Sequence, residues 1–436
     1  MAEAVGWIVL IVGLLISIAL HELGHMIPAK RFGVRVSQYF VGFGPTVWSR
    51  HGKETEYGVK AIPLGGYVRL VGMIPPEDAV KPVRGTGRVA RLIADTRASS
   101  VEEIHPGEDH RAFYRLAWWR KVIVMLGGPL VNLVLAAALF TGVLFFVGLP
   151  GPASLTVAQV TPCVPQPAAE CAPGDPESPA LQAGLEVGDT VTAVDGVAVD
   201  SWEAFTAYVA ARPGEEIVIT VLRDGASVDI ALTPALRERA VYDEDGNPVT
   251  DATGAAVTEE VGYMGISPTA VIERQGIGAG VALTADYLVR TVDVVAHLPQ
   301  NVYHVARAAL GLEDRSQESV IGIVGVGRVA GEISAAEIEG YTITGKIADM
   351  LMVLGGLNLA LFVFNMIPLV PLDGGHVASA LWQGVKNGWA SVRGLARPAP
   401  VDVARMMPLA YGVFGLLLVM GVILIYADIV APVSLV

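Results

Sequence analysis

Uncharged apolar stretches as long as a bilayer is thick are the feature that most limits what this chain can fold into. The first runs over positions 5–20 and ends in the pentapeptide HELGH at 21–25. A spanning helix needs about 20 apolar residues, and ionisable side chains at membrane depth are costly. Three such side chains within five positions therefore predict a functional site inside the membrane.

The composition extends this expectation to a multi-pass membrane protein. Of 436 residues, 53% are hydrophobic and only 17% are charged, which is too apolar for an ordinary soluble enzyme. We expect four spans, at 5–27, 121–147, 347–367 and 407–426. The first is not expected to be a cleavable signal peptide, because it lacks a basic start and a small-residue cleavage site.

The distribution of charge predicts the orientation. Positions 30–121 hold 16 of the 30 Lys and Arg residues, whereas 151–270 holds 19 Asp and Glu against four Arg. Because basic loops remain in the cytoplasm, the acidic region is expected outside. Its acidity also argues against nucleic-acid binding. Cys163 and Cys171 both lie in this outer region, where a disulfide between them is favoured over two free thiols.

The HELGH motif predicts metal chemistry. On a helix, His21 and His25 lie four positions apart on one face and can share a metal, while Glu22 is placed to activate a bound water. A catalytic zinc usually has a third protein ligand. The best candidate is Asp373, in the Pro- and Gly-rich sequence NMIPLVPLDGGH at 365–376, where the third span must break. Asp373 could instead cap the next helix, and His376 is a competing ligand.

Hydropathy and turn patterns predict the structure of the remaining segments. Positions 57–72 (YGVKAIPLGGYVRLVG) predict a β-hairpin that turns at 63–66 and dips into the bilayer. Positions 73–110 predict a mobile cytoplasmic loop. Compact α/β signals follow over 180–234, with a strand at 190–194, a helix at 202–211 and a hairpin at 216–232. Positions 276–310 predict an amphipathic helix that kinks or ends at Pro299.

Two resemblances follow from these residues. The sequence AGLEVGDTVTAVDGVAV and the stretch after it resemble a PDZ domain of the bacterial protease type. Such domains take peptide strands at a sheet edge, although a spacer that excludes large proteins by bulk is an equal alternative. HELGH, the 57–72 hairpin, GGPLVNL in the second span, one PDZ domain and NMIPLVPLDGGH together resemble the bacterial site-2 protease family of intramembrane zinc metalloproteases.

The second resemblance implies roles for particular residues. His21, His25 and Asp373 would bind one zinc ion, and Glu22 would be the general base. The substrate-binding residues it implies are Asn365, Pro368, Gly65, Gly66 and Tyr67. Asn132 matches the family's pattern in the second span, where helix packing is the preferred role.

We therefore expect a polytopic α-helical membrane protein with about four transmembrane helices, an intramembrane β-hairpin and an inserted extracytoplasmic α/β PDZ domain. The expected parts are an N-terminal membrane part (1–150), the PDZ domain with its Cys-containing loop (151–262), an amphipathic connecting region (263–345) and a C-terminal membrane part (346–436). The expected function is the second cut of single-span proteins, such as anti-sigma factors or signal-peptide remnants, in the bacterial inner membrane. The alternative is a non-catalytic PDZ-bearing scaffold with a structural metal.

Overall fold

The chain folds into two compact units. The computed structural model describes residues 2–80, 87–164, 171, 175–241, 257–269, 271–313, 315–316, 319–337 and 341–433. The membrane unit combines Met1–Val147 with Gln275–Val436, and the inserted unit is Gly148–Arg274. The inserted unit thus extends beyond the boundary expected at 262, because β11 (Ile266–Pro268) pairs with β4 (Val157–Val160) inside it.

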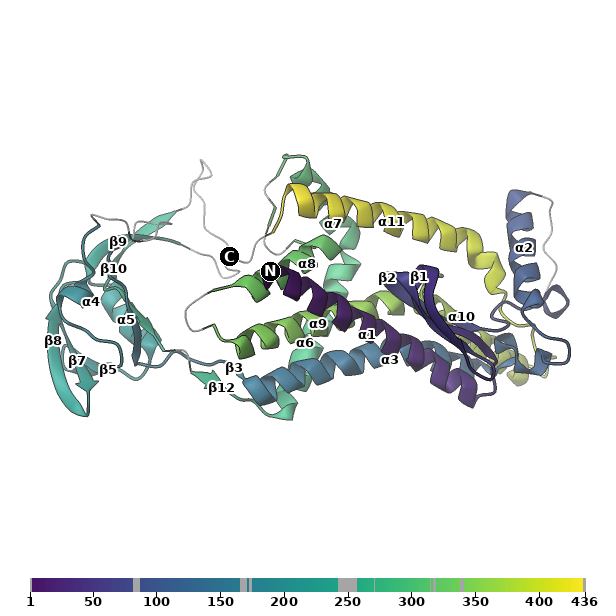
Figure 1. The fold of residues 1–436 in the computed structure, drawn as a ribbon, viewed down its shortest axis with the longest axis horizontal. Coiled ribbons are helices and arrows are strands. Elements are labelled where there is room, and N and C mark those ends of the chain that lie inside the picture. Colours follow the sequence, from purple (N-terminus) through teal and green to yellow (C-terminus); the bar gives the residue numbers. More distant parts are fainter. Residues whose placement is uncertain are drawn as a thin grey trace. The chain divides into compact units, whose positions relative to one another are not determined.

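In the described part of the membrane unit, four helices are long and apolar enough to cross a bilayer, and they coincide with the four predicted segments. Their axes lie roughly along one direction, and successive helices run in opposite senses (Figure 1). These helices are α1 (Ala2–Arg31), α3 (Trp118–Gly142, continued by a π-helical turn at Val143–Val147), α9 (Ile343–Met366) and α11 (Met407–Val430).

Small residues and one buried amide hold α1 against its neighbours. Gly24 of α1 and Gly127 of α3 approach so closely that a Cβ on Gly127 would lie 2.0 Å from the Gly24 carbonyl oxygen. The buried Asn358 of α9 donates to Ser17 Oγ of α1 at 2.9 Å. Without water in the bilayer core, helices associate through such close packing and interhelical hydrogen bonds.

The remaining helices are shorter or more polar. They are α2 (Arg88–Glu102), α6 (Ile277–Ala296), α7 (Leu298–Ala309), α8 (Ile323–Ala335) and α10 (Asp373–Val392), with 3₁₀ turns at Glu77–Ala79, Asp109–Arg111, Phe113–Arg115 and Val403–Met406.

Two predictions from the sequence can be compared with these helices. The predicted loop at 73–110 is wrong where α2 forms, because Ile93 is buried and Arg97 forms a buried ion pair with Asp402, more than 300 residues away. The sequence around α2 cannot predict a partner so far along the chain. The helix expected at 276–310 does end near Pro299: α6 stops at Ala296, and the proline lies in the first turn of α7, where its missing N–H costs nothing.

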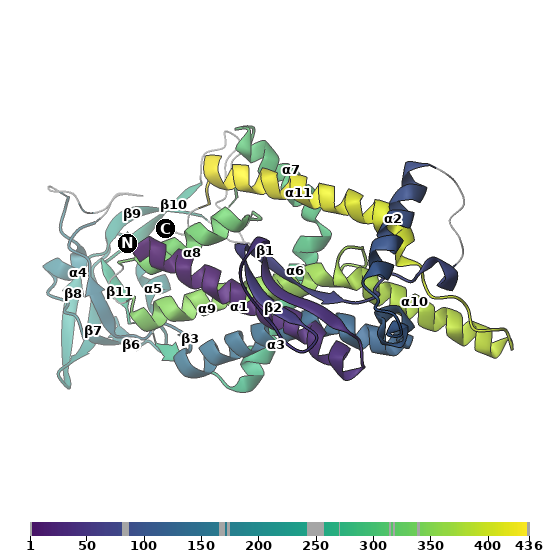
Figure 2. The same cartoon turned by 45° about the vertical axis from the view of Figure 1, so that its right-hand side comes forward.

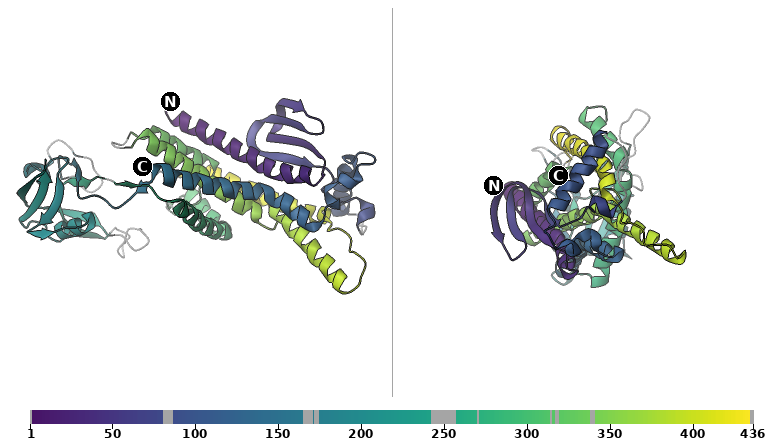
Figure 3. Two further views of the ribbon diagram at one scale, coloured as in Figure 1. Left: turned by 90° about the horizontal axis from the view of Figure 1, so that it is seen from below. Right: turned by 90° about the vertical axis from the view of Figure 1, so that its right-hand side faces the viewer.

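The predicted hairpin at 57–72 is also wrong in its pairing. Strands β1 (Val36–His51) and β2 (Glu56–Leu70) are long and bent, and residues 36–43 of β1 pair with 56–62 of β2 on one side and with 66–70 on the other. The two halves of β2 are therefore separated by β1 rather than paired with each other. The sheet lies along α1 (Figure 3), where Tyr39 Oη donates to the Ala19 carbonyl.

The inserted unit carries a four-stranded antiparallel sheet in the order β6-β5-β7-β8 and three two-stranded pairs. Strand β5 spans the predicted residues Thr190–Val194, the predicted helix is α5 (Trp202–Ala210), and the predicted hairpin is β7 (Ile217–Arg223) with β8 (Ala226–Leu232). The predicted disulfide between Cys163 and Cys171 is present. The other elements are β3 (Leu149–Pro150), α4 (Pro179–Gln182), β6 (Val197–Ala198), β9 (Ala235–Ala240), β10 (Thr258–Tyr263) and β12 (Ile272–Glu273).

Candidate metal centre and active-site cavity

Three side chains from two helices converge inside the membrane unit. His21 and His25 lie one turn apart on α1, and Asp373 is the first residue of α10. The Nε2 atoms of the two histidines are 3.2 Å apart, and Asp373 Oδ2 lies 3.4 Å from that of His21 and 3.3 Å from that of His25. We call these three residues the metal cluster.

The hydrogen bonding of His25 indicates that the cluster is built for a cation. His25 Nδ1 lies 2.8 Å from the Val124 carbonyl oxygen of α3, which can only accept a hydrogen bond. Nδ1 must therefore carry a proton, and in its neutral form the ring presents a lone pair at Nε2. That lone pair faces a carboxylate oxygen and a second imidazole nitrogen. Three electron-pair donors directed at one point are stabilised by a cation between them.

The spacing of the donor atoms fits zinc. Zinc–nitrogen and zinc–oxygen bonds of 2.0–2.2 Å in a tetrahedron separate neighbouring ligand atoms by about 3.3–3.5 Å. The three distances in the cluster lie at or just below this range. The carbonyl that fixes the His25 ring is the second-shell partner that metal-ligating histidines ordinarily have.

The alternatives for the third donor are distinguished by position. Asp373 makes no side-chain cap to its helix, whose N-cap residue is Leu372. Its carboxylate instead faces the two histidines. His376 lines the same cavity but is not one of the donor atoms that converge within 4.8 Å.

Glu22 lies beside the metal cluster on the wall of a cavity of about 430 Å³. The second half of β2 forms another wall, through Gly65, Gly66 and Tyr67. A Cβ on Gly66 would lie 3.2 Å from Glu22 Cγ, so the glycine makes room for the glutamate against the sheet. Within the described residues, 66–70 pairs with no strand other than β1, so no strand covers its other edge.

The structure brings most of the predicted substrate residues to this cavity. Asn365, near the end of α9, lines it together with the three β2 residues. Pro368 does not: it lies in the irregular segment between α9 and α10, is exposed, and is absent from the cavity wall. Pro371, which the sequence did not single out, occupies the wall in its place.

Two residues of α3 complete the site in ways that sequence reasoning missed. A Cβ on Gly128 would lie 2.3 Å from His25 Nε2 and 2.8 Å from His21 Nε2, so only glycine leaves the imidazoles their space. Asn132 is fully buried on the cavity wall, and neither polar atom of its amide has a hydrogen-bond partner in the described part of the chain. The GGPLVNL sequence was the available signal for both, but only contact with α1 shows what it does.

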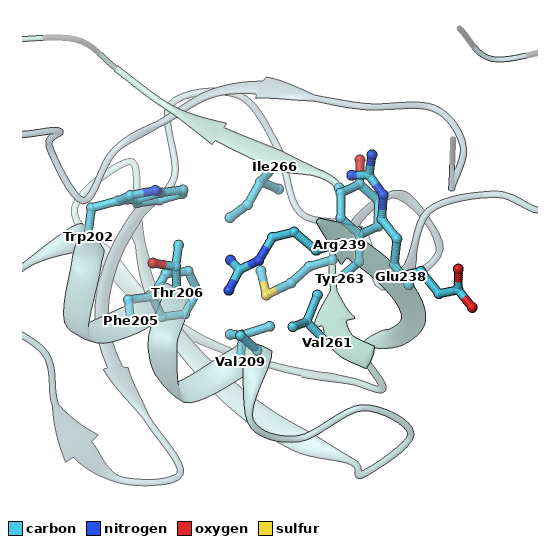
Figure 4. Close-up of a pocket in the computed structure, with 14 residues that line it drawn as sticks. Trp202, Phe205, Thr206, Val209, Glu238, Arg239, Val261, Tyr263 and Ile266 are labelled. Carbon is cyan, nitrogen blue, oxygen red and sulfur yellow. The ribbon is translucent and has the colours of Figure 1, made fainter. Parts of the chain in front are cut away.

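A second cavity, of about 600 Å³, belongs to the inserted unit. Figure 4 shows Trp202, Phe205 and Val209 of α5 on one side of it and Ile266 of β11 on the other. Arg239 of β9 extends between them and pairs with Glu259 at 2.7 Å. This is a largely apolar groove between a helix and a strand, with two cations, Arg237 and Arg239, in its lining.

Comparison with known proteins identifies the family of the chain. The sequence profile of Peptidase family M50 matches residues 9–407. The chain is 34% identical over 440 residues to the zinc metalloprotease Rip1 of Mycobacterium tuberculosis, covering 99% of this chain and 98% of the relative. It is 31% identical to Rip1 of Mycolicibacterium smegmatis over the whole of both chains, and 25% identical to the zinc metalloprotease RasP of Oceanobacillus iheyensis, covering 85% and 88%.

The chain therefore belongs to Peptidase family M50, the site-2 protease family. It is a zinc metalloprotease of the membrane-embedded kind. This decides against the non-catalytic scaffold that the sequence left as an alternative.

Proposed function

We propose that this protein is an endopeptidase that cuts single-span membrane proteins within the bilayer. In this proposal His21, His25 and Asp373 bind one zinc ion per chain, and Glu22 is the general base. The observation that carries it is the convergence of three donor atoms at tetrahedral spacing in a cavity that also contains a glutamate.

The residues divide the chemistry between them. Bound zinc would polarise the scissile carbonyl and lower the pKa of a water molecule. Glu22 takes the proton from the attacking water and returns a proton to the leaving amine nitrogen, which becomes the new N-terminus. The amide of Asn132, which has no hydrogen-bond partner among the described residues, lines the same cavity and is available to the peptide.

The edge of residues 66–70 that no other described strand covers supports a role for this strand in binding the substrate. A helical substrate has its backbone groups bonded within the helix, so it must unwind before its carbonyl can be attacked. Unwound groups in hydrocarbon cost several kcal/mol each unless they find partners. An extended substrate lying along this edge would bond to Gly66 and Tyr67 as an added strand, beside Glu22 and Asn365.

The membrane placement follows from charge. The helix α1 ends in Lys30 and Arg31, and the loop after it is basic, whereas the inserted unit is strongly acidic. We place the basic loop in the cytoplasm and the inserted unit outside, in a bacterial inner membrane.

The inserted unit fits the proposal as a PDZ domain. Its groove between α5 and β11 has a volume of about 600 Å³ and a largely apolar lining, and PDZ domains take peptides as an added strand at such a groove. Exclusion of large substrates by bulk is the other role that we retain. Anti-sigma factors and signal-peptide remnants are the substrate class that we expect.

A metal and activity measurement on matched variants tests the assignment. In purified full-length protein, Glu22→Gln should keep one zinc per chain but lose cleavage of an anti-sigma fragment reduced to its span and a short outer stub. Asp373→Ala should lose both zinc and cleavage. Unchanged turnover by Glu22→Gln would remove that residue as the base, and full zinc content in Asp373→Ala would remove it as a ligand.

A further inference from the structure

The helix α10 carries an exposed apolar stripe that the proteolytic mechanism does not use. Its five large residues are between 47% and 87% exposed, and they recur at positions i, i+1, i+4, i+8 and i+11, which places them on one face. They are Leu381, Trp382, Val385, Trp389 and Val392. We call this set the α10 stripe.

The opposite face of α10 is already occupied. Val377, Ala380 and Ala390 are buried there, and α10 packs on α3, where Gly384 accommodates the Trp118 ring. The helix then projects obliquely from the end of the bundle (Figures 2 and 3). The α10 stripe is therefore left without a partner in the described membrane unit, and a contiguous apolar patch of this kind marks an interaction surface.

Charge and aromatic content identify the partner. Positions 374–401 contain Lys386, Arg393 and Arg397 but no Asp or Glu. The Arg393 guanidinium lies 4.3 Å from the centre of the Trp389 ring, at the border of the stripe. Tryptophan beside cations, along an exposed apolar stripe of a helix, is the pattern of helices that lie in the interface of an anionic membrane.

We infer that α10 lies in the cytoplasmic membrane interface and binds anionic phospholipid, with the α10 stripe at the acyl boundary and the three cations at the headgroups. Trp118 and Trp119 open α3 at the same end, next to α10, and are themselves partly exposed. They would belong to the same interfacial belt. The inference rests on the proposed orientation, in which this end of the bundle faces the cytoplasm.

Depth-dependent quenching in vesicles tests the placement. The native cysteines form a disulfide, so a fluorophore can be attached selectively at Val385→Cys. The matched control is Val187→Cys, another exposed valine, in the inserted unit. In phosphatidylcholine vesicles containing phosphatidylglycerol, the 385 label should be quenched by nitroxides near the headgroups more than by nitroxides at mid-chain, and shielded from aqueous iodide. The 187 label should be quenched by aqueous iodide and unaffected by the lipid nitroxides.

Two results would overturn the inference. Equal iodide quenching at both positions would show that water covers the stripe, and protection of the 385 label from both iodide and lipid nitroxides would show a protein partner, such as a second copy of the chain. Because the label reports position without proteolysis, either result is distinguishable from failure of the proposed enzymatic function.

A second arm tests the lipid charge. Each cation near an anionic surface changes partitioning by about fivefold. Changing Lys386, Arg393 and Arg397 together to Gln should therefore abolish the extra nitroxide quenching that phosphatidylglycerol gives over phosphatidylcholine alone. Arg290→Gln, which removes an exposed cation from α6, should leave that difference intact. A triple variant with an unchanged lipid response would refute the electrostatic part.

Discussion

Replacing Gly128 by alanine should selectively damage the metal site. The added Cβ would lie 2.3 Å from His25 Nε2, 2.7 Å from His25 Cδ2 and 2.8 Å from His21 Nε2. The imidazoles are not flexible chain ends that can turn aside, because His25 is held by the Val124 carbonyl. Either α3 must retreat or both rings must move.

The size of the effect follows from these distances. Ordinary contact requires roughly 3.5 Å between heavy atoms, so the nearest ring atom must recede by about 1 Å. Zinc sites tolerate deviations of only about 0.2 Å in ligand distance. Retreat of α3 would instead open the contact between Gly24 and Gly127. We expect zinc affinity to fall by about 10–100-fold, the range seen when the support of a metal ligand is disturbed.

The assay is competition for zinc between the purified full-length protein and a chromogenic chelator. Gly142→Ala on the same helix is the matched control, because a Cβ there would meet nothing within 4 Å. Its zinc affinity should equal that of the unchanged protein. If Gly128→Ala binds zinc as tightly as Gly142→Ala, the rings do not abut Gly128 in the metal-bound protein and the packing argument fails.

Three further outcomes are expected. Elemental analysis should find zinc lost from Asp373→Ala but retained in His376→Ala; equal loss in both would reopen the choice of third ligand. Gly127→Ala should lower the free energy of unfolding of the membrane unit by about 1–3 kcal/mol, because the added methyl group overpacks the contact with α1. An unchanged melting temperature in detergent would contradict this. Because Arg223 donates to its carboxylate at 2.7 Å, the pKa of Asp189 is held below its ordinary value. That stabilisation of the inserted unit is complete above about pH 4 and is lost as pH falls through the lowered pKa. Asp189→Asn should remove this acid dependence from urea unfolding, followed by a fluorophore on the inserted unit, and an unaltered pH profile would count against the ion pair.

The metal cluster could be predicted from the sequence because its residues lie in two short motifs, HELGH and NMIPLVPLDGGH. The spacing of His21 and His25 places them on one helical face. An aspartate at a helix break would ordinarily cap the next helix, but in a chain that carries HELGH it becomes the best candidate for the third ligand. The strand at 190–194 was predictable for a similar reason, since its alternation and flanking turns are contained in a short window.

What could not be predicted depends on partners distant in sequence. The predicted pairing within β2 is wrong because its two halves have the sequence pattern of a hairpin. In the structure, residues 36–43 lie between them and pair with both. The helix α2 is stabilised through Arg97 by Asp402. The need for glycine at position 128 arises from two imidazoles on another helix, which no pattern within α3 encodes.

The two ends of the inserted unit leave the membrane unit at one place. Gln275 N donates to the Leu144 carbonyl at 3.0 Å, next to the points where the chain departs and returns. A module grafted at such a junction can be exchanged or enlarged without disturbing the helices around it. Under the role proposed for the inserted unit, such an exchange would change which proteins reach this protease and leave the residues of peptide-bond cleavage untouched.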